Sequence, residues 1–321
     1  MSSISINGFT YKWDNQKGAE ILHSCKTPQT FYKYYALNEY SVDALVNMYI
    51  YASHPNQLND LLDCHKDIVV VDDPSTIKNL LGPFEKNARS IYDENGFLEF
   101  ANKAFKTILS SKLGVLSLAS SCDNEVMWAH YAQNNGFCLE FDVNEFPFKC
   151  WGPYPINYLD ELPAYKTSEK GIQIPFLVQC YVKRNVWSYE NEWRMLIQSP
   201  EGVNMRCYNE FGHLEEGLTQ PFSYDRKFKY PLMALKSVRL APHFFKNCCS
   251  SLTEINPMEV NITVESDTLV SKVLSFLYQL QTQYPLKVYC SQVKLKETMR
   301  FYQVTIIKLN EENYRLIEII D

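Results

Sequence analysis

The sequence predicts an α+β fold with mixed, mostly antiparallel sheets and flanking helices. Segments of alternating apolar and polar residues, which are typical of half-buried strands, recur along the chain. Segments with helical spacing separate these strands irregularly, whereas a parallel α/β fold alternates strand and helix regularly. With 321 residues and 46% hydrophobic content, the chain is long enough to bury a substantial core.

The first half of the chain is expected to contain short strands and four helices. Aromatic, β-branched or alternating residues predict strands at 4–13, 31–35, 68–71, 114–119 and 137–142. Apolar spacing predicts helices from Ser41, the expected N-cap, to Ile50, from about 72 to Leu81, at 97–113 and at 125–133. The last helix should stop at residues 134–136, where Asn-Asn-Gly is a common C-terminal signal.

The second half continues the mixed pattern without a Gly/Ser linker or an internal repeat. Strands are expected at 156–158, 177–183, 190–197, 236–240 and 286–290, a helix at 269–281, and a hairpin over 302–320 that turns at 310–313. We expect an N-terminal extension (1–30), a catalytic-like core (31–245) and a C-terminal segment (246–321) packed on that core as one unit.

Composition limits the classes of function. The net charge of −6 argues against tight nonspecific nucleic-acid binding, which needs a basic surface. The chain has no membrane-spanning apolar run and no signal-peptide pattern, so no membrane association and a cytoplasmic location are expected. None of the ten cysteines has Cys-x-x-Cys spacing, and the adjacent Cys248 and Cys249 suit neither a normal disulfide nor a tetrahedral metal site. They are expected to be free thiols.

The segment from 187 to 197 carries the most informative pattern. As a strand, it places Tyr189, Trp193, Met195 and Ile197 on an apolar face and Glu190, Glu192 and Arg194 on the other face. A charged row of this kind is costly to bury, so we expect it to face a cleft. One carboxylate would steady a developing cation while its neighbour orients a nucleophile. The alternative is an ordinary ion pair, which stabilises a protein by about 0–1 kcal/mol.

A second pattern is the strand at 114–119, which leads through a serine-rich turn into the helix at 125–133. The N-terminus of a helix beside serines suits an anion such as a pyrophosphate. Ser117 and His130 are therefore candidate cofactor contacts. Trp128, Tyr131 and Ala132 share one face of the helix, so packing is the favoured role of Trp128.

Other chemistries find little support. His54, Asp60, Asp63 and His65 define an alternative metal cluster, but their spacing matches no established zinc or calcium loop, so no metal site is assigned. The chain lacks a glycine-rich phosphate loop, a Gly-x-Ser-x-Gly elbow and a His-Glu-x-x-His motif. Nucleotide-triphosphate hydrolysis, serine hydrolysis and zinc-protease chemistry are not expected.

Together these segments resemble the bacterial domain-of-unknown-function family 2971. The specific segments are Met-Trp-Ala-His-Tyr-Ala at 127–132 and Tyr-Glu-Asn-Glu-Trp-Arg at 189–194. The supporting segments, in the family's order and spacing, are 31–34, 51–55, 58–60, 63–64, 114–118, 136–142, 157–158, Lys183 and Trp187. The resemblance covers roughly residues 30 to 300.

A weaker resemblance concerns the chemistry. A basic or aromatic first strand, a serine-ended strand before a helix and a later Glu-x-Glu strand are similar to the three-part pattern of ADP-ribosyltransferases. The resemblance implies that Lys33 or Tyr34 holds NAD, Ser117 with Tyr131 shapes the nicotinamide pocket, and Glu192 is catalytic. The chain has Lys-Tyr where that pattern has arginine or histidine. The 14% aromatic content suits the stacking of nicotinamide and adenine, although it equally suits a tyrosine-rich core.

The leading expectation is an ADP-ribosyltransferase-like core that binds NAD as a substrate and cleaves the nicotinamide–ribose bond. Glu192 would stabilise the oxocarbenium-like transition state, Glu190 would orient the acceptor, and Arg194 would keep both carboxylates ionised. The kind of family implies a toxin or phage-defence effector with a macromolecular acceptor and an antitoxin or regulatory partner. The alternatives are a non-catalytic nucleotide- or protein-binding module, and a metal-dependent nuclease or phosphodiesterase.

Overall fold

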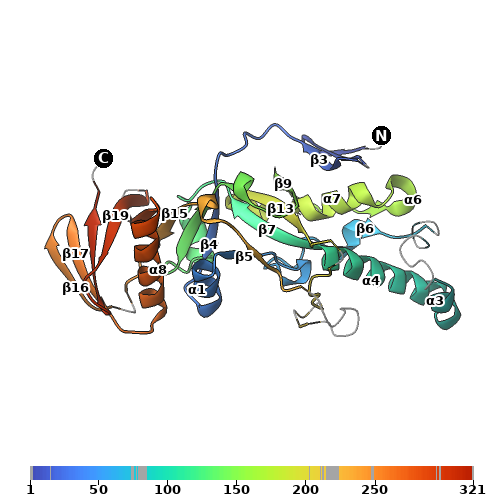
Figure 1. The fold of residues 1–321 in the computed structure, drawn as a ribbon. Coiled ribbons are helices and arrows are strands. Elements are labelled where there is room, and N and C mark those ends of the chain that lie inside the picture. Colours follow the sequence, from blue (N-terminus) through green and yellow to red (C-terminus); the bar gives the residue numbers. More distant parts are fainter. Residues whose placement is uncertain are drawn as a thin grey trace. The chain divides into compact units, whose positions relative to one another are not determined.

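The computed structural model describes residues 3–14, 16–73, 76, 78, 85–201, 203–209, 211, 213–214, 224–246, 249–293, 295 and 298–319 (Figure 1). The chain divides into two compact units with interleaved segments. The first unit is Met1–Thr27, Tyr51–Ser117 and Phe148–Lys227, and the second is Pro28–Ile50, Leu118–Pro147 and Phe228–Asp321. This division differs from the expected boundaries after residues 30 and 245. Most of the expected helix from 72 to 81, and Cys248, lie outside the described residues.

The N-terminal segment forms a three-stranded antiparallel sheet, β1 (Ser3–Ile6), β2 (Phe9–Asp14) and β3 (Gly18–Leu22), in the first unit. The expected single strand at 4–13 is a hairpin, because Asn7 and Gly8 turn the chain with φ angles of 47° and 80°. Asn-Gly favours such turns because both residues tolerate positive φ. Tyr11, on β2, is fully buried in a core that also contains Leu177.

One expected strand is a helix. Most of the segment at 177–183 belongs to α7 (Gln173–Tyr181), and only β12 (Val182–Arg184) is extended, in parallel with β10 (Asn157–Leu159). Residues 174–181 are all buried. Periodicity cannot separate a fully buried helix from a buried strand, which is why the sequence misled here. Pro175 fits because it lies in the first turn, where no helical N–H is lost.

The first unit also contains short helices and strands that position the site. They are η1 (Pro55–Gln57), η2 (Lys66–Ile68), β6 (Val69–Val70), α3 (Glu85–Ile91), α4 (Glu94–Lys112), β9 (Cys150–Pro155), β11 (Tyr165–Lys166), α6 (Thr167–Lys170), η5 (Asn185–Glu190) and β13 (Glu192–Gln198). β13 lies between β9 and β7 (Leu113–Ala119). β7, β5 (Tyr49–Tyr51) and β14 (Lys227–Lys229) each run from one unit into the other.

The second unit is built on a sheet with the strand order β16-β17-β20-β19-β18-β15-β8-β4. Its strands are β4 (Phe31–Tyr35), β8 (Phe137–Phe141), β15 (Leu235–Leu240), β16 (Cys249–Asn256), β17 (Glu259–Val264), β18 (Lys287–Gln292), β19 (Arg300–Lys308) and β20 (Asn313–Glu318). Among the pairings of these strands, only that of β15 with β18 is parallel. The expected hairpin turn at 310–313 joins β19 to β20. The hairpin formed by β16 and β17 was not expected.

Helices cover one face of this sheet (Figure 1). Ser275 of α8 (Leu269–Gln283) hydrogen-bonds Tyr314 at 2.7 Å between hydroxyl oxygens. The side chain of Asn38, and not that of Ser41, caps α1 (Glu39–Val46); Ser41 instead completes a capping box. The remaining elements are α5 (Glu125–His130), η4 (Val143–Glu145) and η6 (Leu232–Ala234).

Trp128 of α5 packs as the helical spacing predicted. Its side chain is fully buried, its Nε1 donates to the carbonyl oxygen of Cys122 at 2.7 Å, and its ring meets that of Tyr34 edge-on. The observed fold confirms the mixed, mostly antiparallel α+β class. Among the described residues, no helix is both long and apolar enough to cross a membrane.

Candidate functional site

The candidate site is built where η5 meets β13. Asn191 joins the two elements in the left-handed conformation, with φ 43°, which asparagine tolerates better than most residues. The expected strand at 190–197 therefore begins two residues later, at Glu192. Glu190 belongs to η5, so the prediction that Glu190 and Glu192 project from one face of a single strand is wrong.

Both faces of β13 are buried. Trp193, Met195 and Ile197 are 5%, 1% and 0% exposed, as the apolar face predicted. Glu192 and Arg194 are 4% and 0% exposed, so the expected cleft-facing row is enclosed instead. Buried charges persist in proteins when they are paired and hydrogen-bonded, and both conditions hold here.

Arg194 directs every guanidinium nitrogen at an acceptor. Nη1 and Nη2 donate to Oδ1 and Oδ2 of Asp63 at 2.8 and 2.7 Å, which is a bidentate pair. Nε and Nη2 donate to Oε1 of Glu192 at 2.9 and 2.7 Å. Nη1 also donates to the carbonyl oxygen of Cys180 at 2.7 Å. Arg194 therefore connects η5–β13 to the loop that carries Asp63.

Lys183 of β12 is the second cation. Its Nζ donates to Oε2 of Glu190 at 2.6 Å and to Oε2 of Glu192 at 3.3 Å, and lies 3.7 Å from Oδ2 of Asp63. Burial alone would lower the pKa of Lys183, but the three carboxylates outweigh it and raise that pKa. We call Asp63, Lys183, Glu190, Glu192 and Arg194 the charged network.

Glu192 lies between the two cations of the charged network. Burial would raise its pKa, but the charges of Arg194 and Lys183 and hydrogen bonds from Ser117 and Arg194 outweigh burial and lower the pKa to about 2. The backbone N–H of Glu192 donates to the Tyr158 hydroxyl at 2.9 Å. The carboxylate is therefore ionised across the physiological range, as expected from its arginine neighbour.

Aromatic side chains of η5 lie beside the charged network. The ring centroid of Trp187 is 5.0 Å from Nζ of Lys183, within the range of a cation–π contact. The rings of Trp187 and Tyr189 are 6.1 Å apart. Both side chains are only partly buried, so Tyr189 does not have the buried position that the strand pattern predicted for it. Lys183 is thus in contact with the partly exposed η5.

The predicted cofactor contacts do not all lie in this unit. Ser117 reaches Glu192 in the first unit, whereas Lys33, Tyr34, His130 and Tyr131 belong to the second unit. Tyr34 is 8% exposed and donates its hydroxyl to a backbone carbonyl at 3.0 Å. His130 is exposed, and its ring lies 5.1 Å from that of Tyr131. The structure therefore brings together Ser117, Glu190, Glu192 and Arg194, and brings His130 beside Tyr131.

The start of α5 is already capped. The side-chain oxygen of Asn124 accepts hydrogen bonds from the N–H groups of Val126 and Met127 at 3.0 and 3.3 Å. These are the donors that a pyrophosphate at this helix start would use. The sequence pattern that predicted an anion site at this turn is explained by capping.

His54 and Asp63, two residues of the metal alternative, have other partners. Asp63 pairs with Arg194, while Nδ1 of His54 accepts the backbone N–H of Asn56 at 3.0 Å. Burial, reinforced by the charge of Arg226, lowers the pKa of His54 to about 3. Across the part of the chain that the structure describes, no group of three His, Cys, Asp or Glu side chains is placed to hold a metal ion.

Sequence reasoning missed two members of the charged network as site residues. Asp63 was considered as a metal ligand and as part of a family pattern, and Lys183 only as part of that pattern. Lys183 did carry a signal, because it follows the segment 174–182, which is apolar except for Gln179, and buried lysines are rare unless they are paired. Asp63 carried no comparable signal, since its pairing depends on how a polar loop folds onto β13.

Comparison with known proteins finds one similarity. Residues 127–195 match the model of a family described as "Protein of unknown function (DUF2971)". The match contains both specific motifs of the expected resemblance and four members of the charged network, but is much shorter than the expected region from 30 to 300. The chain matches no curated protein and no solved structure. Similarity to this family is thus shown for that segment, and the family's description carries no activity.

Proposed function

We propose that this protein is an NAD-dependent ADP-ribosyltransferase-like enzyme in which Glu192 is the catalytic carboxylate. The observation that carries the proposal is the hydrogen bond between Ser117 and Glu192, which joins the second and third elements of the three-part pattern. The low pKa of Glu192 supports it further, because the chemistry needs an ionised carboxylate at this position.

In the proposed reaction, the bond between C1′ of the ribose and the nicotinamide nitrogen breaks. Nicotinamide leaves as a neutral molecule with the bonding electron pair, and positive charge develops on the ribose. The Glu192 carboxylate stabilises this charge and accepts a hydrogen bond from a ribose hydroxyl. Glu190 orients the acceptor, whose nucleophilic atom bonds to C1′ and loses its proton. Arg194 holds Glu192 in place.

Access to Glu192 is the main requirement of this proposal. Glu190 and Glu192 are each 4% exposed, so η5 has to move away from β13 before NAD reaches the carboxylate. Lys33, Tyr34, His130 and Tyr131 remain proposed NAD contacts. The toxin or phage-defence role, a macromolecular acceptor and an antitoxin partner are further parts of the proposal.

The test is release of nicotinamide from NAD, followed by proton NMR. Wild type is expected to release nicotinamide, and Glu192→Gln is expected to be slower by at least about 100-fold, because it loses the charge that stabilises the ribosyl cation. Glu140→Gln is the matched control: Glu140 is also a low-pKa carboxylate paired with an arginine, but it lies in the second unit. It should retain turnover.

Three outcomes would contradict the enzyme proposal. One is equal release by wild type and Glu192→Gln. Another is loss of release in Glu140→Gln to the same extent as in Glu192→Gln. The third is no release and no thermal stabilisation by NAD, since a protein that binds NAD only when folded is stabilised by it. Circular dichroism of each variant separates loss of chemistry from loss of fold.

A second candidate function is a non-catalytic nucleotide- or protein-binding module. The observation that favours it is the complete pairing of Glu190 and Glu192 with Lys183 and Arg194, which a purely structural network also requires. Thermal stabilisation by NAD without release of nicotinamide would favour this candidate over the enzyme.

A further inference from the structure

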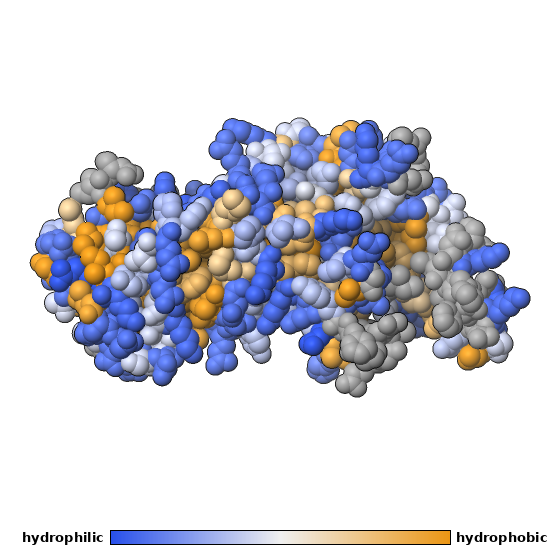
Figure 2. Space-filling view, viewed as in Figure 1, coloured by the Kyte–Doolittle hydropathy of each residue, from blue (hydrophilic) through white to orange (hydrophobic). Residues whose placement is uncertain are grey.

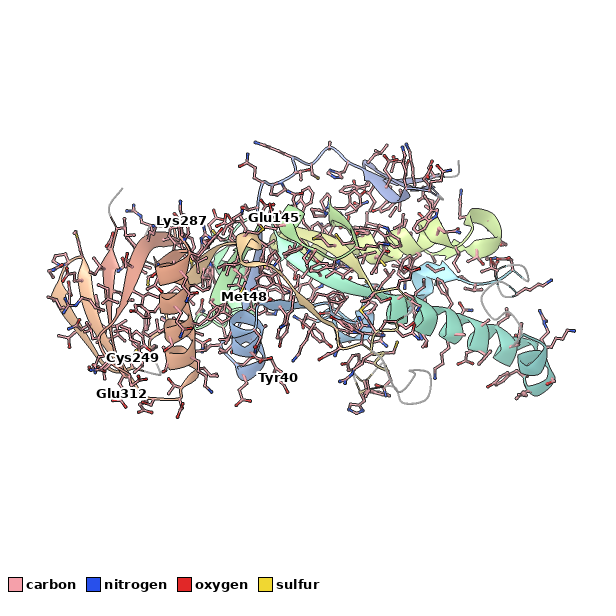
Figure 3. The ribbon with its side chains drawn as sticks, viewed as in Figure 1. Tyr40, Met48, Glu145, Cys249, Lys287 and Glu312 are labelled. Atoms are coloured by element: carbon pink, nitrogen blue, oxygen red, sulfur yellow. The ribbon has the colours of Figure 1, made fainter. Side chains whose placement is uncertain are left out.

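The two faces of the sheet in the second unit differ in polarity. On the face that α8 covers, the paired residues of β8, β15, β18 and β19 are apolar and buried: Leu139, Val238, Val288 and Val304. Figure 2 shows this side of the unit, with apolar side chains gathered beside α8. Side chains alternate between the faces of a strand, so the neighbours of these residues point to the opposite face. Lys287, labelled at the start of β18 in Figure 3, is one of them.

Arg239 of β15 is held by a carboxylate on this opposite face. Its Nη1 donates to Oε2 of Glu140 at 2.9 Å and to Oγ of Ser237 at 2.5 Å. Hydroxyl groups fix Glu140 in turn, with donation from Ser237 at 2.6 Å, Thr30 at 2.8 Å and Tyr32 at 3.2 Å. The side chains of Arg239 and Glu140 are 11% and 16% exposed. Arg239 is therefore fixed in place close to the surface.

Three aromatic rings surround the guanidinium group of Arg239. Its central carbon lies 5.1 Å from the ring centroid of Tyr32, 4.8 Å from that of Tyr289 and 5.6 Å from that of Phe301. These distances lie within the range of cation–π contacts. All three aromatic residues are only partly buried. The guanidinium thus lies among ring surfaces that extend to solvent.

One edge of this guanidinium has no acceptor among the described residues. Nε of Arg239 is buried without a hydrogen-bond partner, and the hydrogen bonds of the group come from Nη1 alone. In Arg194, by contrast, Nε and Nη2 both donate to the Glu192 carboxylate. A buried N–H group without an acceptor is costly, and native proteins contain few of them. The edge formed by Nε and Nη2 of Arg239 is therefore suited to an acceptor from a ligand.

We propose that Arg239 binds a small aromatic carboxylate through Nε and Nη2. A planar carboxylate matches this edge of a guanidinium with two parallel hydrogen bonds. The ring of the ligand would pack against the surrounding rings in the offset or edge-on arrangements that aromatic groups prefer. Tyr289 is the ring that turns aside to admit the ligand, because the hydroxyl of Tyr32 is held by Glu140 and Phe301 packs against Trp128.

The charge of Glu140 favours a carboxylate over a phosphate. Glu140 already balances the charge of Arg239, so a ligand of charge −1 leaves a small net negative charge in the site. A phosphate monoester carries about −1.5 to −2 at pH 7, and Glu140 would repel it more strongly. The site lies within the second unit and uses none of the proposed NAD contacts. Release of nicotinamide therefore does not depend on it.

Isothermal titration calorimetry of the full chain tests the proposal, with benzoate, acetate, inorganic phosphate and benzyl alcohol as probes. Benzoate should bind more tightly than each of the other three. Arg239→Lys should weaken benzoate binding at least about 10-fold, because an ammonium group lacks the planar pair of donors. This variant keeps a cation beside Glu140, which favours retention of the fold. Arg315→Lys is the matched control, since Nε of Arg315 donates to Asn261 at 3.0 Å on another strand of the sheet, and it should bind benzoate like wild type.

Four results would overturn the proposal. They are no binding of benzoate by wild type, unchanged binding in Arg239→Lys, an equal loss in Arg315→Lys, and binding of benzyl alcohol as tight as that of benzoate. Phosphate that binds more tightly than benzoate would overturn the assignment to a carboxylate, and acetate of equal affinity would overturn the role of the rings. The comparison of probes uses wild type alone, so it decides the ligand class even where a variant fails to fold. Circular dichroism shows whether each variant is folded.

Discussion

Replacing Arg194 with methionine is expected to lower the free energy of unfolding of the first unit by about 3–5 kcal/mol. The substitution keeps an apolar stem of similar length but removes the cation that pairs with both Asp63 and Glu192. Three buried carboxylates, Asp63, Glu190 and Glu192, would then remain with Lys183 as the one cation of the network. Urea denaturation followed by tryptophan fluorescence measures this loss, because four of the five tryptophans (13, 151, 187 and 193) belong to the first unit.

Arg206→Met is the matched control for this experiment. Arg206 is an exposed arginine of the same unit, and surface substitutions usually change stability by no more than about 0.5 kcal/mol. If Arg194→Met destabilised the unit no more than the control does, the charged network would not hold the first unit together.

Acid is expected to destabilise the first unit through Glu192. The pKa of this carboxylate falls from an ordinary 4.5 to about 2 in the folded protein, so the folded state favours its ionised form. Its contribution to stability is therefore present above pH 4.5 and is lost as the pH falls toward 2. The size of this pKa shift predicts that the free energy of unfolding falls by on the order of 3 kcal/mol.

The measurement is the urea midpoint of wild type and Glu192→Gln at a series of pH values. Wild type should lose stability steeply between pH 4.5 and 2, and the variant should lose less over the same interval because its amide does not titrate. The two proteins are compared by how steeply the urea midpoint falls with pH, since the variant starts from a lower stability. Parallel curves would show that Glu192 does not account for the acid sensitivity.

Local sequence signals predicted much of the secondary structure. The helical spacing around Trp128, the alternation on β8 and the turn between β19 and β20 can all be read from residues close together in the sequence. Alternation also predicted that Trp193 is buried. In each case the spacing of apolar and polar residues in the sequence matches the observed helix, strand or turn.

The charged network was harder to predict because its contacts are distant in sequence. Asp63 meets Arg194 across 131 positions, and no local pattern indicates that pairing. The row Glu190, Glu192, Arg194 was recognised as costly to bury, but the conclusion that it faces a cleft assumed that no partners were available. Asp63 and Lys183 are those partners. The assignment of Glu190 to a strand failed for a different reason, because the left-handed Asn191 interrupts the extended chain.

The most direct test of this account is a double-mutant cycle on Asp63 and Arg194. Asp63→Asn, Arg194→Met and the double variant are compared with wild type by urea denaturation, and the interaction energy follows from the difference between the double variant and the sum of the singles. A coupled network predicts an interaction energy of about 1–3 kcal/mol, with the double variant less destabilised than that sum. Additivity within about 0.5 kcal/mol would contradict the claim that these charges act as one network.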